Sequence, residues 1–207
     1  MDKIIPSFKK SLFSGSKSII ADLSELGIDS LLDKEIVKDI PIISLFIGVK
    51  NTVQNIYGRN ALIQILKFIN EFNSGTIDEA KLEEYRRKIN DDPKKAEKEL
   101  GKIIIILSNN TESIILANFY RNYINGYISW DEFCELSEVL NLLFINDIKI
   151  LEKIQNKKLA ENEESKLYQI NRLEAFGLIN RNIAVWNKNN LEITELGEKL
   201  LKYKNLS

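Results

Sequence analysis

The three prolines of this 207-residue chain stand at positions 6, 41 and 93, so the last 114 residues contain none. Proline lacks the backbone N–H donor and breaks the interior of a helix, so this half of the chain is free to form long helices. Apolar residues also recur there at three- and four-residue steps, which is typical of helices that bury one face. We therefore predict a mainly α fold: a multi-helix globular bundle with one β-hairpin near the C-terminus.

Several helices of the first half have recognisable start signals. The apolar residues of segment 59–72 share one helical face, and Thr76 with Glu79 has the spacing of a capping box for a helix that ends near Ile89. Asp92 followed by Pro93 predicts the next helix, because proline is well tolerated at the first helical position. The apolar run 103–107 would also suit a buried strand, but its surroundings favour a continuation of this helix.

The segment 129–154 has the longest helical periodicity of the chain. Ser129 and Glu132 again have capping-box spacing, and the apolar residues that follow predict either one helix of about 25 residues or two helices with a break near Asn146. The polar stretch 156–165 is the candidate linker. It divides the chain into a helical body, residues 1–155, and a small C-terminal module, residues 156–207.

The composition excludes several kinds of chemistry. The chain has no histidine, so it cannot by itself form a Ser-His-Asp triad or a histidine-ligated metal site, and its single cysteine, Cys134, cannot form an intramolecular disulfide. The charges of the acidic and basic side chains nearly cancel, and the net charge is −1. We expect no catalytic residue, no cofactor and no metal. We also expect a cytoplasmic location, because the first twenty residues lack the apolar core of a secretory signal.

The longest apolar stretch runs from Ile40 to Val49. A helix that crosses a bilayer needs about 20 apolar residues, so ten cannot span it. We interpret this segment as a buried helix that begins at Pro41, and we keep shallow membrane insertion as an alternative.

The C-terminal sequence LEAFGLINRNIAVWNKNNLEITELGEKLL, from residue 173 onward, predicts a helix that ends at Gly177, a hairpin and a last helix capped by Thr194. This order resembles the end of a winged-helix domain. The resemblance covers about 45 residues and implies that one helix reads the DNA major groove while the hairpin contacts phosphates. The candidate nucleic-acid contacts would be Lys166, Gln169, Asn171, Arg172, Arg181 and Lys188.

Two features of the same region argue against DNA. From Ile145 onward there are 11 basic and 9 acidic residues, and Glu163, Glu164 and Glu174 lie on or beside the candidate reading helix. Such a surface would bind phosphates weakly. The alternative is a small module of the same topology that binds a protein partner.

The segment 122–133 matches the second half of an EF-hand calcium loop, with Asn125, Gly126 and Glu132 at the expected spacing. The first half does not match, because Arg121 and Tyr123 stand where carboxylates should bind the ion. We therefore predict a helix–turn–helix corner in which Ile128 enters the core and Ser129 caps the next helix.

As a whole, the chain resembles bacterial helical proteins carried on mobile elements or in phage-defence neighbourhoods, through segments 26–53, 119–133, 173–179 and 193–201. The resemblance implies a non-enzymatic component of phage–host conflict. We therefore predict an intracellular interaction or regulatory protein that binds a protein partner or associates with itself. A winged-helix DNA-binding regulator is the first alternative, and an effector that associates with membranes through segment 40–49, without stable insertion, is the second.

Overall fold

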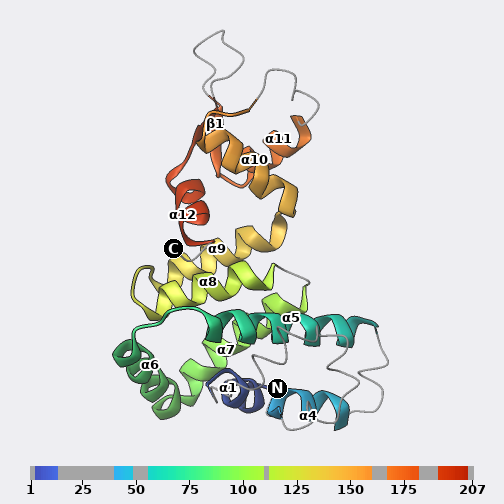
Figure 1. The fold of residues 1–207 in the computed structure, drawn as a ribbon, viewed down its shortest axis with the longest axis vertical. Coiled ribbons are helices and arrows are strands. Elements are labelled where there is room, and N and C mark those ends of the chain that lie inside the picture. Colours follow the sequence, from blue (N-terminus) through green and yellow to red (C-terminus); the bar gives the residue numbers. More distant parts are fainter. Residues whose placement is uncertain are drawn as a thin grey trace.

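The computed structural model describes residues 3–13, 40–48, 56–109, 112–159, 167–181 and 191–204, and it confirms a mainly helical fold with one small hairpin (Figure 1). The helices are α1 (Ile4–Phe13), α4 (Pro41–Gly48), α5 (Ile56–Ser74), α6 (Glu79–Asp91), α7 (Pro93–Ser108), α8 (Ser113–Ile124), α9 (Trp130–Leu142), α10 (Ile145–Gln155), α11 (Leu167–Ala175) and α12 (Glu195–Tyr203). The strands β1 (Ile179–Arg181) and β2 (Leu191–Ile193) pair antiparallel, with Ile179 opposite Ile193.

The structure has two lobes, a larger one built from α1 and α4–α9 and a smaller C-terminal one. An aromatic cluster forms the centre of the larger lobe. Helix α5 packs along α8, and α1 packs against α4 and α7. The ring of Tyr120 on α8 is fully buried, and its centroid lies 5.5–5.9 Å from the centroids of four other rings, which come from α5, α6 and α9: Phe68, Phe72, Tyr85 and Phe133. Rings packed at these distances and tilts add to the stabilisation from burial alone.

Most of the predicted helix starts are confirmed. Asp92 accepts hydrogen bonds from the backbone N–H groups of α7, Ser129 and Glu132 form the predicted capping box of α9, and Thr194 caps α12. The run 103–107 is helical. The cap predicted at Thr76 is wrong, because the N-cap of α6 is Asp78, whose carboxylate accepts from Lys81 N at 3.0 Å.

The segment 129–154 forms two helices, and the break lies at Leu143 and Phe144 rather than at Asn146. Both residues have extended backbone conformations, with ψ near 150°. The carboxylate of Asp147 accepts a hydrogen bond from the backbone N–H of Phe144 at 2.9 Å, so it satisfies a donor at the start of α10. The predicted position of the break was therefore too late by two or three residues.

Helix α10 packs against α11, β2 and α12, so the C-terminal lobe includes α10, which begins eleven residues before the polar stretch 156–165. Its apolar centre includes Leu151, Leu173, Leu178 and Leu200. Gly177 follows α11 with φ of 69°, a left-handed conformation that glycine adopts without steric penalty, and the chain turns there into β1.

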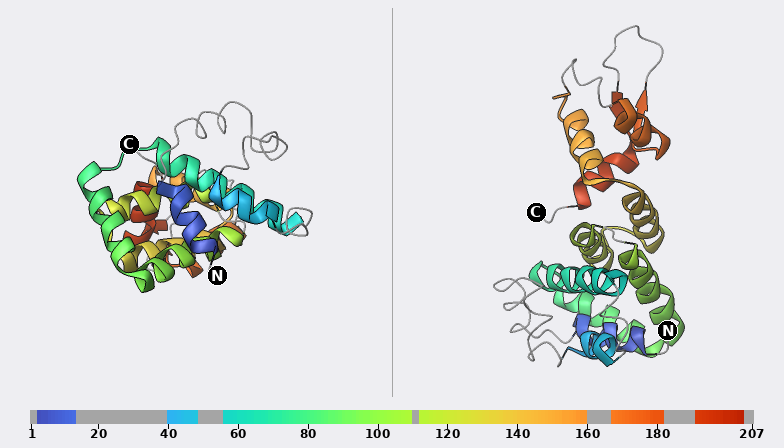
Figure 2. Two further views of the ribbon diagram at one scale, coloured as in Figure 1. Left: turned by 90° about the horizontal axis from the view of Figure 1, so that it is seen from below. Right: turned by 90° about the vertical axis from the view of Figure 1, so that its right-hand side faces the viewer.

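The C-terminal lobe lies on α8 and α9 at one end of the larger lobe (Figure 2, right). Polar contacts join the two lobes. Asn118 on α8 donates to the backbone carbonyl of Lys204 at 2.6 Å, and Lys199 on α12 pairs with Glu132 at 2.9 Å. This ion pair, followed by the hydrogen bonds from Ser129, lowers the pKa of Glu132 to about 2.

The apolar segment 40–49 forms α4 up to Gly48. Ile40, Ile42 and Ile43 are buried, and the backbone N–H of Ile42 donates to Ser11 Oγ at 3.0 Å. Within the described ranges, no helix combines the length and the apolar character that crossing a bilayer requires. Ile40, Ile42 and Ile43 are thus buried in the core, and α4 packs against α1.

The segment that matches half an EF-hand forms the predicted corner between α8 and α9. Gly126 has φ of 77°, and Ile128 is buried in the core. Asn125 Oδ1 accepts from the backbone N–H of Asp78 at 3.0 Å, and Arg121 pairs with Glu71 at 2.8 Å. These polar groups are therefore engaged in holding the corner to the rest of the lobe.

Candidate interaction cleft

A cleft of about 640 Å³ opens where the two lobes meet, and we take it as the candidate functional site. It lies between the end of α7, the start of α8, the break between α9 and α10, and one face of α11. We call this site the cleft, and its lining residues are Asn109, Glu112, Leu140, Asn141, Leu143, Phe144, Ile145, Asn146, Tyr168, Gln169 and Arg172.

Large apolar side chains lie exposed at the cleft. Seven large apolar residues are exposed among the residues that the structure describes, and four of them line the cleft or the adjoining groove of α9: Leu142, Phe144, Ile145 and Tyr168. The exposed fractions of Phe144 and Tyr168 are 64% and 63%. Single exposed apolar residues are ordinary, but a group of them beside a hollow is typical of an interaction site.

The extended backbone at Leu143 and Phe144 places three of these side chains, those of Leu142, Phe144 and Ile145, at the surface. If α9 continued without a break, the four consecutive apolar residues 142–145 would point around the helix in different directions. The break instead separates the end of α9 from the start of α10, and Leu142, Phe144 and Ile145 are all exposed there.

An ion pair inside the C-terminal lobe fixes the wall of the cleft. Arg172 on α11 binds Asp147 on α10 through two hydrogen bonds, Nε to Oδ2 at 2.8 Å and Nη2 to Oδ1 at 2.9 Å. Asp147 is fully buried, and its hydrogen bonds raise the pKa of Arg172. The guanidinium lies over the ring of Phe144, 4.6 Å from its centroid, and 5.9 Å from that of Tyr168. These contacts hold both rings beside a charge-neutral pair.

Gln169 contributes a polar group that nothing in the described structure satisfies. Its side chain lines the cleft and is only 5% exposed, yet its Oε1 has no hydrogen-bond partner. A buried acceptor without a donor destabilises the folded state by about 1–3 kcal/mol.

A second hollow, the α9 groove, adjoins the cleft along α9. Its volume is about 590 Å³, and it is lined by Asp131, Glu132, Cys134, Glu135, Glu138, Val139 and Leu142. Glu138 and Asn141 are three residues apart and therefore neighbours on α9, and Glu138 lines the groove while Asn141 lines the cleft. The two hollows therefore form one surface.

The candidate nucleic-acid contacts are placed as follows. Gln169 is buried, and Arg172 uses Nε and Nη2 to bind Asp147. Arg181 donates to Asn171 at 2.7 Å and pairs with Glu174 at 3.1 Å. Lys166 and Lys188 lie outside the described residues. The structure thus brings Gln169 and Arg172 together in the cleft, and it pairs Asn171 with Arg181 away from it.

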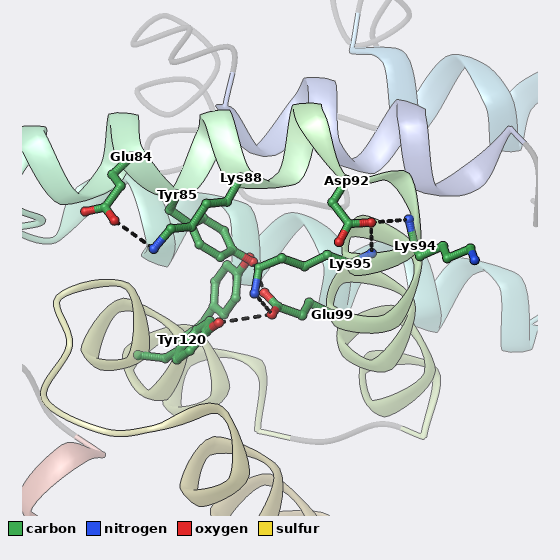
Figure 3. A network of polar contacts seen from close by, with 9 residues as sticks. Glu84, Tyr85, Lys88, Asp92, Lys94, Lys95, Glu99 and Tyr120 are labelled. Carbon is green, nitrogen blue, oxygen red and sulfur yellow. Dashed lines mark hydrogen bonds and ion pairs between the residues drawn. The ribbon is translucent and has the colours of Figure 1, made fainter.

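The other conspicuous polar cluster lies deep in the larger lobe (Figure 3). Glu99 on α7 is buried and accepts hydrogen bonds from Tyr85 at 2.5 Å, from Lys95 at 2.5 Å and from Tyr123 at 3.0 Å. Tyr120 in turn donates to the hydroxyl of Tyr85 at 2.6 Å. Each of these groups has a partner within the fold, so the cluster is suited to joining α6, α7 and α8.

Burial raises the pKa of Tyr85, Tyr120 and Tyr123, so these hydroxyls remain protonated donors. Burial also raises the pKa of the Cys134 thiol in the α9 groove, which makes it a weaker nucleophile. No group of three or more Cys, Asp or Glu side chains in the described ranges is arranged to hold a metal ion.

Comparison with protein-family models, with curated protein sequences and with solved structures finds no match to this chain. The assignment of the cleft therefore depends on its own geometry. Periodicity alone missed it, because apolar residues such as Phe144 look like core positions in the sequence. The one available signal was the run of four apolar residues, 142–145, which is too wide for a single buried helical stripe.

Proposed function

We propose that this protein is a non-enzymatic interaction or regulatory component of the cell interior, and that it binds a protein partner through the cleft. The observation that carries the proposal is the group of exposed aromatic and aliphatic side chains, led by Phe144 and Tyr168, around a partly polar hollow. Aromatic residues in such positions commonly supply most of the binding energy of a protein interface. The resemblance noted from the sequence suggests phage–host conflict as the setting.

The arrangement of polar groups favours binding over catalysis. A nucleophile or general base needs an accessible group within hydrogen-bonding reach of a second functional group. Arg172 is instead engaged with a buried carboxylate, and Gln169 and the asparagines of the cleft carry amides that do not titrate. The exposed amides of Asn109 and Asn146 are suited to forming hydrogen bonds with a partner.

The alternative of DNA binding receives less support from the placement of the side chains. Base reading by α11 would need Gln169 and Arg172 to be accessible, whereas one is buried and the other is held in a bidentate pair. The acidic side chains of the adjoining α9 groove would also repel phosphates.

The test is affinity capture with a variant of the cleft and a matched control. Phe144→Ser combined with Tyr168→Ser removes two exposed rings, and Tyr127→Ser removes a ring of similar exposure at the α8–α9 corner. We expect the wild type and Tyr127→Ser to retain the same partner after nuclease treatment, and the double variant to lose it. Retention of that partner by a folded double variant would refute the proposal.

A further inference from the structure

The charges around the cleft identify the kind of partner that it suits. We propose that the cleft and the α9 groove together bind a positively charged amphipathic segment of a protein partner. The segment's apolar side chains would enter between Leu142, Phe144 and Tyr168, and its Lys or Arg side chains would face the acidic edge of α9. This inference rests on the proposed function and adds the chemistry of the partner.

The first argument is the balance of charge along the combined surface. Five lining residues are acidic, and the one basic lining residue, Arg172, is neutralised by Asp147. Among the acidic residues, Glu132 pairs with Lys199 and Glu138 pairs with Lys102 at 2.6 Å. Glu112, Asp131 and Glu135 are exposed and form no ion pair with any other residue that the structure describes. A basic partner would find these three carboxylates uncompensated.

The second argument is the type of hydrogen-bonding group that the cleft leaves open. Glu112 occupies the N-cap position of α8, but its side chain makes no capping hydrogen bond. As an exposed carboxylate, Glu112 only accepts hydrogen bonds, and Lys and Arg side chains carry donors without acceptors. A partner rich in carboxylates would offer Glu112 no donor.

The third argument is the exposed faces of the aromatic rings. The rings of Phe144 and Tyr168 already accept the Arg172 guanidinium, yet about two thirds of each side chain remains accessible. A further Lys or Arg can lie over such a face, because the π-electron density attracts cations. The long alkyl stems of these side chains would also cover Leu142 and Ile145 while their charged ends reach the carboxylates.

The experiment uses the full-length chain and two fluorescent peptides of about 15 residues, near the shortest length at which isolated helices form. The basic probe contains Lys, Ala and leucines at three- and four-residue spacing, and the acidic probe has Glu in place of every Lys. Fluorescence anisotropy is measured at about 50 mM and about 200 mM NaCl, conditions that differ strongly in electrostatic screening. We expect binding of the basic probe that weakens with salt, and no binding of the acidic probe.

Two variants separate charge from apolar contact. Asp131→Asn with Glu135→Gln removes two uncompensated charges and should weaken binding of the basic probe by about tenfold. The matched control, Asp91→Asn with Glu97→Gln, removes one Asp and one Glu that are exposed but lie outside both hollows, and should leave the affinity unchanged. Phe144→Ser with Tyr168→Ser should abolish binding.

Three outcomes would overturn the inference. Equal or tighter binding of the acidic probe would assign the wrong charge to the partner while leaving the proposed role of the cleft intact. Absence of binding by both probes would reject an amphipathic segment as the occupant. A wild-type dimer in analytical ultracentrifugation that the Phe144→Ser and Tyr168→Ser variant converts to a monomer would identify a second copy of the chain as the occupant. The proposed function itself fails only if the cleft variant keeps its captured partner.

Discussion

The buried tyrosines predict that the protein loses stability steeply in alkaline solution. Burial raises the pKa of Tyr85, Tyr120 and Tyr123 in the folded state, whereas an unfolded tyrosine ionises near pH 10. Above about pH 10 the unfolded chain therefore releases three protons that the folded chain keeps. A group with a raised folded pKa contributes its full stability below the unfolded value, and that contribution falls as the pH rises above it.

The size of this loss of stability follows from the number of tyrosine protons that the folded chain retains. Each retained proton lowers the free energy of unfolding by about 1.4 kcal/mol per pH unit, so the three tyrosines together remove about 4 kcal/mol between about pH 9 and about pH 11. This is a large part of the 5–15 kcal/mol that is typical for a folded domain. The assay is urea unfolding at a series of pH values, followed by tryptophan fluorescence and far-UV circular dichroism.

The variant Tyr123→Phe separates the contribution of one tyrosine hydroxyl from the other effects of alkaline solution on stability. At neutral pH it loses the hydrogen bond to Glu99 and should unfold about 1 kcal/mol more easily than the wild type. By about pH 11 this deficit should disappear, because the variant lacks one of the three protons that the wild type must retain. Tyr127→Phe, at an exposed ring, is the control and should stay parallel to the wild type. A Tyr123→Phe curve that also stays parallel would refute the reasoning.

Four further substitutions test the packing of glycines and of buried polar groups, each by urea unfolding. A Cβ at Gly197 would stand 2.3 Å from the carbonyl oxygen that precedes β1, so Gly197→Ala should lower the free energy of unfolding by more than about 2 kcal/mol. At Gly101 the nearest neighbour of a Cβ is 3.6 Å away, so Gly101→Ala should raise the free energy of unfolding by up to about 1 kcal/mol. The reverse order would contradict this packing. Asp147→Asn should destabilise by about 2 kcal/mol, because the charged hydrogen bonds from Arg172 and from the backbone N–H of Phe144 to the buried carboxylate are weakened, and an unchanged midpoint would show that they contribute nothing. Gln169→Met should stabilise the protein by about 1–3 kcal/mol, and a loss of stability would mean that its Oε1 is satisfied in solution.

Local sequence signals predicted the helix starts where the cap and the capped groups are neighbours in the chain. Asp92, Ser129 and Thr194 each bond to backbone groups two or three residues ahead, so spacing alone identified them. At α6 the prediction chose Thr76, whereas Asp78 is the cap and also binds a backbone N–H three residues ahead, that of Lys81. The backbone N–H of Asp78 in turn binds Asn125, 47 residues away, and that tertiary contact is not visible in the local sequence.

The cleft could not be predicted for the same physical reason. The break between α9 and α10 depends on Asp147, which is held by Arg172 from another helix, 25 residues further along the chain. Sequence reasoning selected Arg172 and Gln169 as candidate contact residues because of their chemistry. It could not show that Arg172 would be bound to a buried carboxylate or that Gln169 would be buried without a partner. The residue types were informative, and their environments had to come from the fold.

The contrast between the two polar clusters explains why the cleft, and not the core, is the better candidate for function. Glu99 is buried with a Lys and two tyrosines that satisfy it, so any ligand there would have to replace good hydrogen bonds and close packing. Around the cleft, the Glu112 carboxylate and the ring of Phe144 remain exposed, so a partner would gain hydrogen bonds and apolar burial with little to displace. Binding lowers the free energy most where the folded chain alone leaves such groups unsatisfied. On that ground, substitutions of the exposed cleft residues Phe144 and Tyr168 should affect association more than stability, and substitutions around Glu99 should do the opposite.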